Sequence, residues 1–241
     1  MLKISFYGCS DTGLKRTNNE DAFLAEADFG ICVLADGMGG AAAGEIASQI
    51  FIQTAMDVFT SVVTHSDRDA LDLIQESYER ANQRILQHVE EYPQHKGMGC
   101  TGEMLVFNDG HYAMGHVGDS RIYLYRNGNL QQLTRDHSLV QDLIDQGAIT
   151  PAQARTHLLR HVIMRAVGTK DSVSVQLETG DVVAGDVFLV CSDGLTDMID
   201  DAAIDGILAL PLNLADKVGR LIEAAKLEGG KDNITVVLGE L

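Results

Sequence analysis

The apolar residues of the chain follow two different periods. In two long stretches they recur every three or four positions, which predicts amphipathic helices. The apolar positions of the first stretch are Ile46, Ile50, Phe51, Ala55, Val58, Phe59 and Val62. The second stretch starts at a plausible N-cap, Asp67, and ends before Pro93, with apolar positions at Leu71, Ile74, Tyr78, Ala81, Ile85 and Val89. Two such helices in succession need a sheet or each other to cover their apolar faces.

Elsewhere the apolar runs are short and bounded by turn residues, which is typical of β-strands. We expect strands at 2–9, 22–26, 31–35, 103–107, 111–117, 121–125, 130–133, 172–177, 186–192 and 234–238. Asp109-Gly110 and Asn127-Gly128 each separate two of these runs, and both dipeptides favour tight hairpin turns. The four runs between 103 and 133 are therefore predicted to form an antiparallel meander.

The remaining segments predict shorter helices. Residues 138–166 have a helical pattern that Gly147 and Pro151 interrupt, so we expect a surface excursion of short helices there. Further helices are expected at 201–208 and after an N-cap at Asn213. Because pairs of helices are flanked by groups of hairpin-linked strands, we predict an α+β protein. Its two antiparallel sheets would pack together, with helices outside them.

Composition narrows the number of domains and the class of partner. The 241 residues include three prolines and no linker-like run, so a single domain over residues 1–241 is expected. With 35 acidic and 18 basic residues the formal charge is −17, which argues against nucleic acid or an anionic membrane surface as the main partner. This charge and the lack of an obvious apolar patch favour a monomer.

The cysteines and the apolar runs bear on the cellular compartment. The four cysteines have no C-x-x-C spacing, and Cys32 and Cys191 lie within apolar runs, where a buried free thiol is expected. The N-terminal residues lack the apolar core of a signal peptide, and no apolar run has membrane-spanning length. We therefore expect a reduced, cytoplasmic protein.

The main chemical signal lies where apolar runs meet acids. Asp36-Gly37 and Asp193-Gly194 each follow a buried run, and Asp232 precedes the last strand. Each Asp-Gly pair taken alone is as consistent with a simple turn as with a functional site. Carboxylates that converge without matching lysines repel one another unless a cation neutralises them, and oxygen ligands favour Mg²⁺ or Mn²⁺. Two such ions ~3.5–4 Å apart would supply a hydroxide nucleophile and hold a phosphate.

Other residues allow a functional and a structural interpretation. Arg16, just upstream of Glu20 and Asp21, is of the right type to bind a phosphate through two parallel hydrogen bonds. Taken alone, such an arginine more often forms a surface ion pair. His157 and His161 have the i, i+4 spacing of a metal-binding pair on a helix. No acid or cysteine partner is evident for them, so we interpret them as polar surface residues.

Six motifs resemble, in their order, those of one enzyme family. They are Asp11-x-Gly13-x-x-Arg16-x-x-Asn19-Glu20-Asp21, Ala35-Asp36-Gly37-Met38-Gly39-Gly40, Gly115-His116-Val117-Gly118-Asp119-Ser120-Arg121, Leu133-Thr134-Arg135-Asp136-His137-Ser138, Cys191-Ser192-Asp193-Gly194-Leu195 and Lys231-Asp232-Asn233-Ile234-Thr235. Over essentially the whole chain, the sequence resembles the metal-dependent serine/threonine protein phosphatases of type 2C, in a compact bacterial form. The resemblance implies a four-layer α/β/β/α sandwich, in agreement with the layered prediction.

The resemblance also implies roles for particular acids. Asp36 would bridge two Mn²⁺ or Mg²⁺ ions, and the Gly37 carbonyl would bind one of them. Asp193 and Asp232 would complete the coordination of the other ion. Asp119, together with Asp193, would hold a third and weaker ion.

Around these ligands, the resemblance implies supporting roles. Glu20 and the adjacent Asp21 would act mostly through water, and Arg16 would bind the substrate phosphate. Residues 138–166 would form a flap beside the site and take part in substrate selection. Met38 and Ala41 occupy positions where some family members carry a histidine, so we assign no general acid.

The implied activity is hydrolysis of phosphoserine and phosphothreonine in phosphorylated protein substrates, in opposition to a Ser/Thr kinase. It would proceed by direct attack of a metal-bridging hydroxide, without a phosphoenzyme. Two alternatives stay open. One is a pseudophosphatase that binds phosphoproteins without turnover, and the other is a metal phosphoesterase for small molecules.

Overall fold

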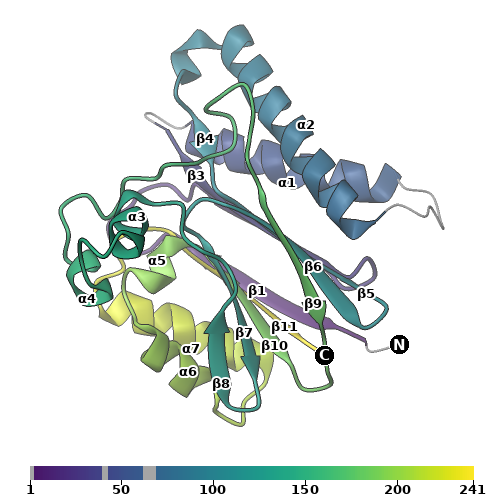
Figure 1. Cartoon of the computed structure of the whole chain (residues 1–241), viewed down its shortest axis with the longest axis vertical. Helices are drawn as coiled ribbons and strands as arrows, with labels where there is room; N and C mark the ends of the chain where they lie inside the picture. Colours follow the sequence, from purple (N-terminus) through teal and green to yellow (C-terminus); the bar gives the residue numbers. More distant parts are fainter. Residues whose placement is uncertain (1–2, 40–42, 62–68) are drawn as a thin grey trace.

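The computed structural model describes residues 3–39, 43–61 and 69–241, and two antiparallel sheets lie face to face at its centre (Figure 1). The first sheet has the strand order β1-β11-β10-β7-β8. Its strands are β1 (Ser5–Asp11), β11 (Ile234–Glu240), β10 (Val187–Cys191), β7 (Arg121–Arg126) and β8 (Asn129–Gln132). The second sheet has the order β2-β3-β5-β6-β9, and β4 pairs with β3. Its strands are β2 (Asp21–Glu26), β3 (Ile31–Met38), β4 (Gly99–Cys100), β5 (Gly102–Asn108), β6 (His111–Val117) and β9 (Gln176–Asp181).

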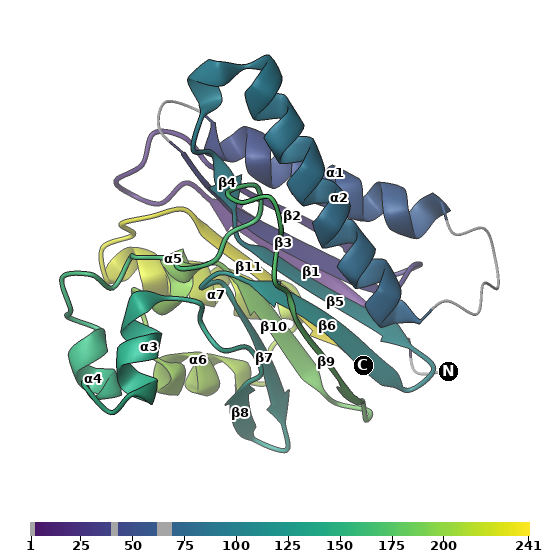
Figure 2. The same ribbon diagram turned by 45° about the horizontal axis from the view of Figure 1, so that its top comes forward.

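Helices cover the outer face of each sheet (Figure 2). The second sheet is covered by α1 (Gly44–Ser61) and α2 (Ala70–Glu91). The first sheet is covered by α5 (Asp193–Thr196), α6 (Asp201–Leu208) and α7 (Leu214–Leu227). Three apolar clusters fill the spaces between these four layers, one below each helical layer and one between the sheets. The predicted α+β class and α/β/β/α layering are therefore confirmed.

The apolar faces of α1 and α2 pack on the second sheet at Gly102 of β5. Phe51 of α1 and Tyr78 of α2 pack edge to face, with ring centroids 4.9 Å apart. Both rings lie over Gly102 of β5, where a Cβ atom would come within 2.6 Å of Phe51. The Tyr78 hydroxyl also donates a hydrogen bond of 2.7 Å to the Gly102 carbonyl. This strand position accommodates two aromatic rings because it carries no side chain.

The predicted meander from 103 to 133 is wrong, although both hairpins exist. The turns at Asp109-Gly110 and Asn127-Gly128 have positive φ at both residues, as tight hairpins of this type require. The β5–β6 hairpin belongs to the second sheet, however, and the β7–β8 hairpin to the first. The chain changes sheets after β6, and β7 pairs with β10 instead of β6. Alternating apolar residues define each hairpin but do not specify which neighbour it joins.

Several element boundaries also differ from the prediction. β1 runs from Ser5 to Asp11, and residue 2, where we expected it to begin, lies outside the described residues. β3 continues beyond residue 35 to Met38, because Gly37 and Met38 pair with β4. The strand expected at 172–177 begins later, as β9, since its register is set by pairing with β6.

The helix starts were predicted with mixed success. Asn213 caps α7, as expected, and its side chain accepts a hydrogen bond of 2.9 Å from the Asp216 N–H. The predicted cap Asp67 lies outside the described residues, as does Val62. α2 begins after Asp69, whose carboxylate accepts a bond of 3.2 Å from the Leu71 N–H. A 3₁₀ turn, η1 (Pro93–His95), follows this helix.

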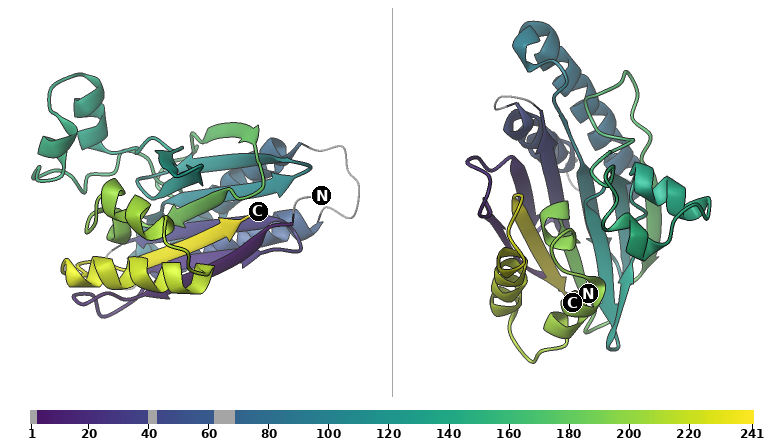
Figure 3. Two further views of the ribbon diagram at one scale, coloured as in Figure 1. Left: turned by 90° about the horizontal axis from the view of Figure 1, so that it is seen from below. Right: turned by 90° about the vertical axis from the view of Figure 1, so that its left-hand side faces the viewer.

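Residues 138–166 form the expected surface excursion. It contains two short helices, α3 (Leu139–Asp145) and α4 (Pro151–Ala154), which stand away from the sheets (Figure 3). Its two ends are held together, because the Leu139 N–H donates to the Val162 carbonyl at 2.9 Å. This excursion and α5 lie at one end of the sheets, and the chain termini lie toward the other (Figure 1).

The burial of the cysteines agrees with the prediction from sequence. Cys32 and Cys191 are buried free thiols, as predicted, and Cys100 is a third. Among the helices in residues 3–39, 43–61 and 69–241, none combines the length and the apolar character that crossing a bilayer requires.

Candidate metal centre

Asp36 lies on β3 and is held by two hydrogen bonds to Thr101. Its N–H donates to the Thr101 hydroxyl at 2.9 Å, and the Thr101 N–H donates to the Asp36 carbonyl at 2.8 Å. The Thr101 hydroxyl also bonds with the Ser120 hydroxyl at 2.9 Å. Burial raises the pKa of Asp36 well above its usual value, and the carboxylates of neighbouring aspartates raise it further. Asp36 is thus fixed within a strand and surrounded by like charge.

Gly37 is a glycine because no side chain fits at this position. A Cβ atom would lie 2.2 Å from the Gly44 carbonyl oxygen and 2.6 Å from the Glu20 carbonyl oxygen. Both are backbone atoms of neighbouring segments. The Gly37 N–H also donates to the Glu20 carbonyl at 3.1 Å. The glycine therefore brings the start of α1 and the loop before β2 against the backbone beside Asp36.

Asp21 faces Asp36 from the neighbouring strand. The two residues are direct partners in the β2–β3 register. The hydroxyls of Ser192 and Thr235 donate to Asp21 Oδ2 at 2.8 and 2.6 Å, which ties the second sheet to the first. Asp21 Oδ1 is buried and has no hydrogen-bond partner among the described residues. Burial raises the pKa of Asp21 to about 6, although the two hydroxyls partly oppose this shift.

Asp193 and Asp232 lie just outside two adjacent strands of the first sheet, β10 and β11. Asp193 opens α5 immediately after β10, and Asp232 precedes β11, which pairs with β10. A Cβ atom at Gly194 would lie 1.9 Å from the Asn233 carbonyl oxygen, so the two segments are in direct backbone contact. Burial and the charges of Asp119, Asp197 and Asp232 raise the pKa of Asp193 well above its usual value.

Asp119 joins the centre from the loop between β6 and β7, where the chain changes sheets. Burial raises the pKa of Asp119 to about 7, and the charge of Asp136 contributes to this rise. Its Oδ1 atom is buried without a hydrogen-bond partner among the described residues, and the same holds for Asp193 Oδ1. Three carboxylates of the centre thus each have one buried oxygen that no donor in the described chain satisfies.

Arg16 and Glu20 lie at the edge of this cluster. Arg16 Nη2 forms an ion pair of 2.7 Å with Asp232 Oδ2, and the Arg16 side chain is half exposed. Burial would lower the pKa of Arg16, but the hydrogen bond to Asp232 and the negative charges of Asp232, Glu20 and Asp36 together raise it. Glu20 is partly buried near Arg16 and Glu45, and burial raises its pKa. Arg16 therefore forms the surface ion pair that was one of its two interpretations, and its partner belongs to the centre.

The donor set fits a hard divalent cation. The cluster offers carboxylate oxygens, three of which are buried and unsatisfied. Unpaired buried charge is costly, and the mutual repulsion that raises these pKa values is relieved by a cation between the groups. Oxygen-only ligand sets are those of Mg²⁺ and Mn²⁺, not those of zinc or copper. The acids that the sequence singled out thus come together at one end of the sandwich.

His161, which we interpreted as a polar surface residue, lies beside this centre. Ligand atoms of His161, Asp193 and Asp197 all lie within 4.8 Å of one another, and His161 Nδ1 is 3.3 Å from Asp197 Oδ2. The statement that His161 has no acidic partner is therefore wrong. α4 ends at Ala154, so His157 and His161 do not share a helical face. Asp197 follows α5, far away in sequence, and no local pattern indicates this contact.

The supporting hydroxyls were also missed. Thr101, Ser192 and Thr235 bond directly to Asp36 or Asp21, although none was assigned a role from sequence. Ser192 and Thr235 lie within motifs that the sequence analysis quoted, directly before Asp193 and three residues after Asp232. Their position inside these motifs was the available signal.

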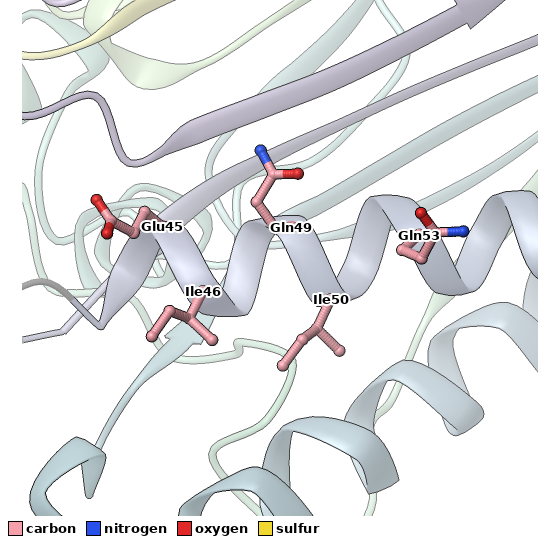
Figure 4. A pocket seen from close by; sticks show the side chains of 5 residues that line it. All are labelled: Glu45, Ile46, Gln49, Ile50 and Gln53. Atoms are coloured by element: carbon pink, nitrogen blue, oxygen red, sulfur yellow. The ribbon is translucent and has the colours of Figure 1, made fainter.

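A groove of about 600 Å³ lies beside the start of α1 (Figure 4). Ile46 and Ile50 point to one side of the helix, and Gln49 points to the other. Of the lining residues, Glu45 is close enough to the centre for its charge to raise the pKa of Glu20. The groove is otherwise separate from the carboxylate cluster.

The family assignment follows from a match over most of the chain. The model of the family described as protein phosphatase 2C matches residues 14–232, which contain every acid of the cluster. The chain belongs to the protein phosphatase 2C family. Its motifs were the basis of the resemblance stated above, which is confirmed.

Named relatives include two bacterial protein phosphatases. The chain is 40% identical over 245 residues to the serine/threonine protein phosphatase PstP of Mycobacterium tuberculosis. That match covers all of this chain but only 45% of PstP, so the chain spans less than half the length of this relative. It is 37% identical over 232 residues to the protein phosphatase PhpP of Streptococcus pneumoniae, covering 95% of this chain and 94% of PhpP.

A solved structure supports the same fold. The crystal structure of the PstP catalytic domain, in complex with two manganese ions, has a TM-score of 0.90 to this chain. The sequences are 39% identical, and the match covers 99% of this chain and 98% of that one.

Proposed function

We propose that this chain is a metal-dependent protein serine/threonine phosphatase. The observation that carries the proposal is the cluster of aspartates at one end of the sandwich, with buried oxygens that no described donor satisfies. Arg16 lies at its edge, where a guanidinium can bind a phosphate. The names of the relatives PstP and PhpP and the two manganese ions in the PstP structure support the proposal.

The proposed ligands come from both sheets. Asp36 and the Gly37 carbonyl would hold one Mn²⁺ or Mg²⁺ ion, and Asp36, Asp193 and Asp232 the other. Asp119, together with Asp193, would hold a weaker third ion. When bound, these ions supply the positive charge that stabilises a reacting phosphate and make water acidic enough to act as the nucleophile.

Residues around these ligands orient them. Glu20 and Asp21 would contribute mostly through water, and the two hydroxyl bonds to Asp21 Oδ2 direct its Oδ1 away from the hydroxyls. Arg16, which is half exposed, is accessible to the phosphate of a substrate. Met38 carries no proton to donate, and Ala41 lies outside the described residues, so no side chain is assigned to protonate the leaving group.

The substrates would be phosphorylated proteins, and a Ser/Thr kinase would supply them. Phosphoserine and phosphothreonine esters fit an open site at the end of the sheets, because the half-exposed Arg16 is accessible from solvent. Residues 138–166 would act as a flap that selects substrates, since they stand beside α5 (Figure 1). We further infer that residues 1–241 form a single, monomeric catalytic domain. The apolar cluster between the sheets, which draws on both of them, supports the single domain.

The test uses two Asp-Gly dipeptides that differ in surroundings. Asp36→Asn is expected to reduce Mn²⁺-dependent phosphate release from a phosphothreonine peptide by about 10³-fold, because it removes a charged ligand shared by two ions. Asp109→Asn is the matched control, since Asp109 lies in an exposed hairpin turn where asparagine fits equally well. Equal activity of the wild type and Asp36→Asn would contradict the proposed centre.

The two alternatives predict different results in the same assay. Manganese binding without any phosphate release from the peptide would favour a pseudophosphatase. Faster turnover of a nucleotide or a sugar phosphate than of the phosphopeptide would favour a small-molecule phosphoesterase.

A further inference from the structure

A buried glutamate–histidine pair lies in the apolar layer between the two sheets. Glu103 of β5 and His116 of β6 are direct partners in register, and both side chains are fully buried. His116 Nδ1 lies 2.9 Å from each Glu103 carboxylate oxygen. Their neighbours on the same face of these strands include Leu105 and Met114 of the inter-sheet cluster. Burial raises the pKa of Glu103 to about 8 despite the nearby imidazole.

The stability of the fold does not by itself explain a glutamate and a histidine at these two buried positions. Removing polar groups from water costs free energy, up to several kcal/mol for each ion, and apolar residues of similar size are often at least as stabilising. A pair of leucines at these positions would continue the inter-sheet cluster. The carboxylate and the imidazole must therefore serve the contacts that they make with other segments.

His116 connects this pair to the segment before the flap. Its Nε2 atom lies 2.9 Å from the Arg135 carbonyl oxygen. Because a carbonyl only accepts, Nε2 carries a hydrogen, and the second exchangeable proton lies between Nδ1 and Glu103. The carboxylate thus fixes the orientation of the ring, and the ring fixes the Arg135 carbonyl. The His116 ring also stacks on the His137 ring, with centroids 4.5 Å apart.

His137 contacts both the centre and the far end of the flap. Its N–H donates to the Gly118 carbonyl at 2.6 Å, and its Nδ1 accepts from the Gly118 N–H at 3.2 Å. Its carbonyl accepts from the Met164 N–H at 2.8 Å. Gly118 directly precedes Asp119, whose buried Oδ1 is unsatisfied among the described residues. His137 therefore links the Asp119 loop to both ends of the flap.

We propose that Glu103, His116 and His137 are positioning residues that hold the Gly118-Asp119 turn and the base of the flap against the second sheet. The contacts run from the carboxylate in the sheet, through the two imidazoles, to the backbone on each side of the centre. The proposed role of the three residues is positioning only, and none of them is proposed as a metal ligand or as a contact of the substrate phosphate. Their role in turnover rests on the proposed phosphatase function, whereas their role in positioning does not.

The decisive experiment separates positioning from stability. The double variant Glu103→Leu/His116→Leu is expected to unfold at a temperature no lower than the wild type, because an apolar pair fits the inter-sheet layer. Amide hydrogen exchange at Gly118, His137 and Met164 is expected to be at least about tenfold faster, since their hydrogen bonds lose the support of the His116 ring. Phosphopeptide kcat/KM is expected to fall about 10- to 100-fold, which is the usual effect of disturbing residues behind metal ligands.

A matched control comes from another buried carboxylate. Asp186 is fully buried, pairs with Arg126 at 2.6 Å, and lies at the start of β10, whereas Asp193 follows the end of that strand. Asp186→Asn is expected to lower the unfolding temperature without changing exchange at Gly118 and Met164 or the turnover. Glu103→Gln is a milder second variant, and it is expected to accelerate the same amides by a smaller factor.

Each outcome bears on the proposal. Wild-type exchange at Gly118, His137 and Met164 in a folded double variant would overturn it, as would equal acceleration in Asp186→Asn. If the double variant does not fold, exchange in Glu103→Gln decides in the same way. If the wild-type protein shows no turnover, the phosphatase proposal fails, and the exchange measurements still test the positioning role.

Discussion

Asp36-Gly37 and Asp109-Gly110 are the same dipeptide in opposite surroundings. In the hairpin, Asp109 and Gly110 have φ of 45° and 87°, and a Cβ atom at Gly110 would meet nothing within 4 Å among the described residues. In β3, Gly37 does not have a positive φ, but a Cβ atom there would lie 2.2 Å from the Gly44 carbonyl oxygen. Glycine is thus needed for conformation in the turn and for space at the metal centre.

The acids differ in the same way. Asp109 is exposed to water, which screens its charge. Asp36 lies among Asp21, Asp193 and Asp119, whose charges add to the effect of burial on its pKa. A turn tolerates many polar residues in place of aspartate, whereas a cluster of like charges needs a cation or protonation to relieve its repulsion. The comparison therefore separates a structural Asp-Gly pair from a functional one by surroundings that the dipeptide itself does not reveal.

The largest expected difference concerns the two glycines. Gly37→Ala places a methyl group against backbone atoms of Gly44, which cannot move like a side chain, so β3 must shift. We expect a loss of about 1–3 kcal/mol in unfolding free energy and a fall of about 100-fold in phosphate release. Gly110→Ala is expected to cost about 1 kcal/mol through its positive φ and to leave turnover unchanged. Equal kinetic effects in the two variants would break the comparison.

A second pair of variants compares two similar ion pairs. Arg16–Asp232 and Arg84–Asp57 are both 2.7 Å long, and each arginine is about half exposed. Replacing either arginine by alanine is expected to change the unfolding free energy by less than about 1 kcal/mol. Only Arg16→Ala is expected to raise the KM for a phosphopeptide, by about tenfold, because only Arg16 lies at the centre. An unchanged KM in Arg16→Ala would remove Arg16 from the proposed phosphate site.

The pH dependence of stability gives a smaller difference. In chelator-treated protein, the pKa of Asp119 is about 7 and that of Asp21 about 6, against about 3.9 in an unfolded chain. Between these values the folded protein binds more protons than the unfolded chain, so stability is expected to fall as the pH rises from about 4 to 7. Asp119→Asn should flatten this slope, whereas Asp109→Asn should not. Calorimetric unfolding temperatures across this range measure both, and identical slopes would contradict the raised pKa values.

The smallest expected effect comes from a glycine without either role. Gly206 lies within α6, and a Cβ atom there would meet nothing within 4 Å among the described residues. Gly206→Ala is expected to stabilise the protein by about 0.5–1 kcal/mol, because alanine favours a helix more than glycine does. Denaturant unfolding measures this gain, and a loss of stability would contradict the expectation that the position is free to take a methyl group.

Local patterns predicted the elements that local chemistry controls. The Asn213 cap, the two hairpin turns and the apolar faces of α1 and α2 each depend on residues within a few positions of one another. The start of β9 and the end of β3 were missed, because each is set by pairing with a strand distant in sequence. The same reason explains the false meander, in which correct hairpins were joined within one sheet instead of two.

The amino-acid sequence determined the family and the identity of the acids, because the six motifs keep their residues and order whatever the spatial arrangement. The periods of the apolar residues also predicted the α+β class with helices outside two packed sheets, and the family resemblance implied the four-layer order. Only the tertiary structure decided three sets of contacts. His161 meets Asp197, and the hydroxyls of Ser192 and Thr235 orient Asp21. Glu103 supports the Asp119 loop through two histidines. The bonds from Ser192 and Thr235 to Asp21 join residues 171 and 214 positions apart, and they form only because the two sheets pack face to face.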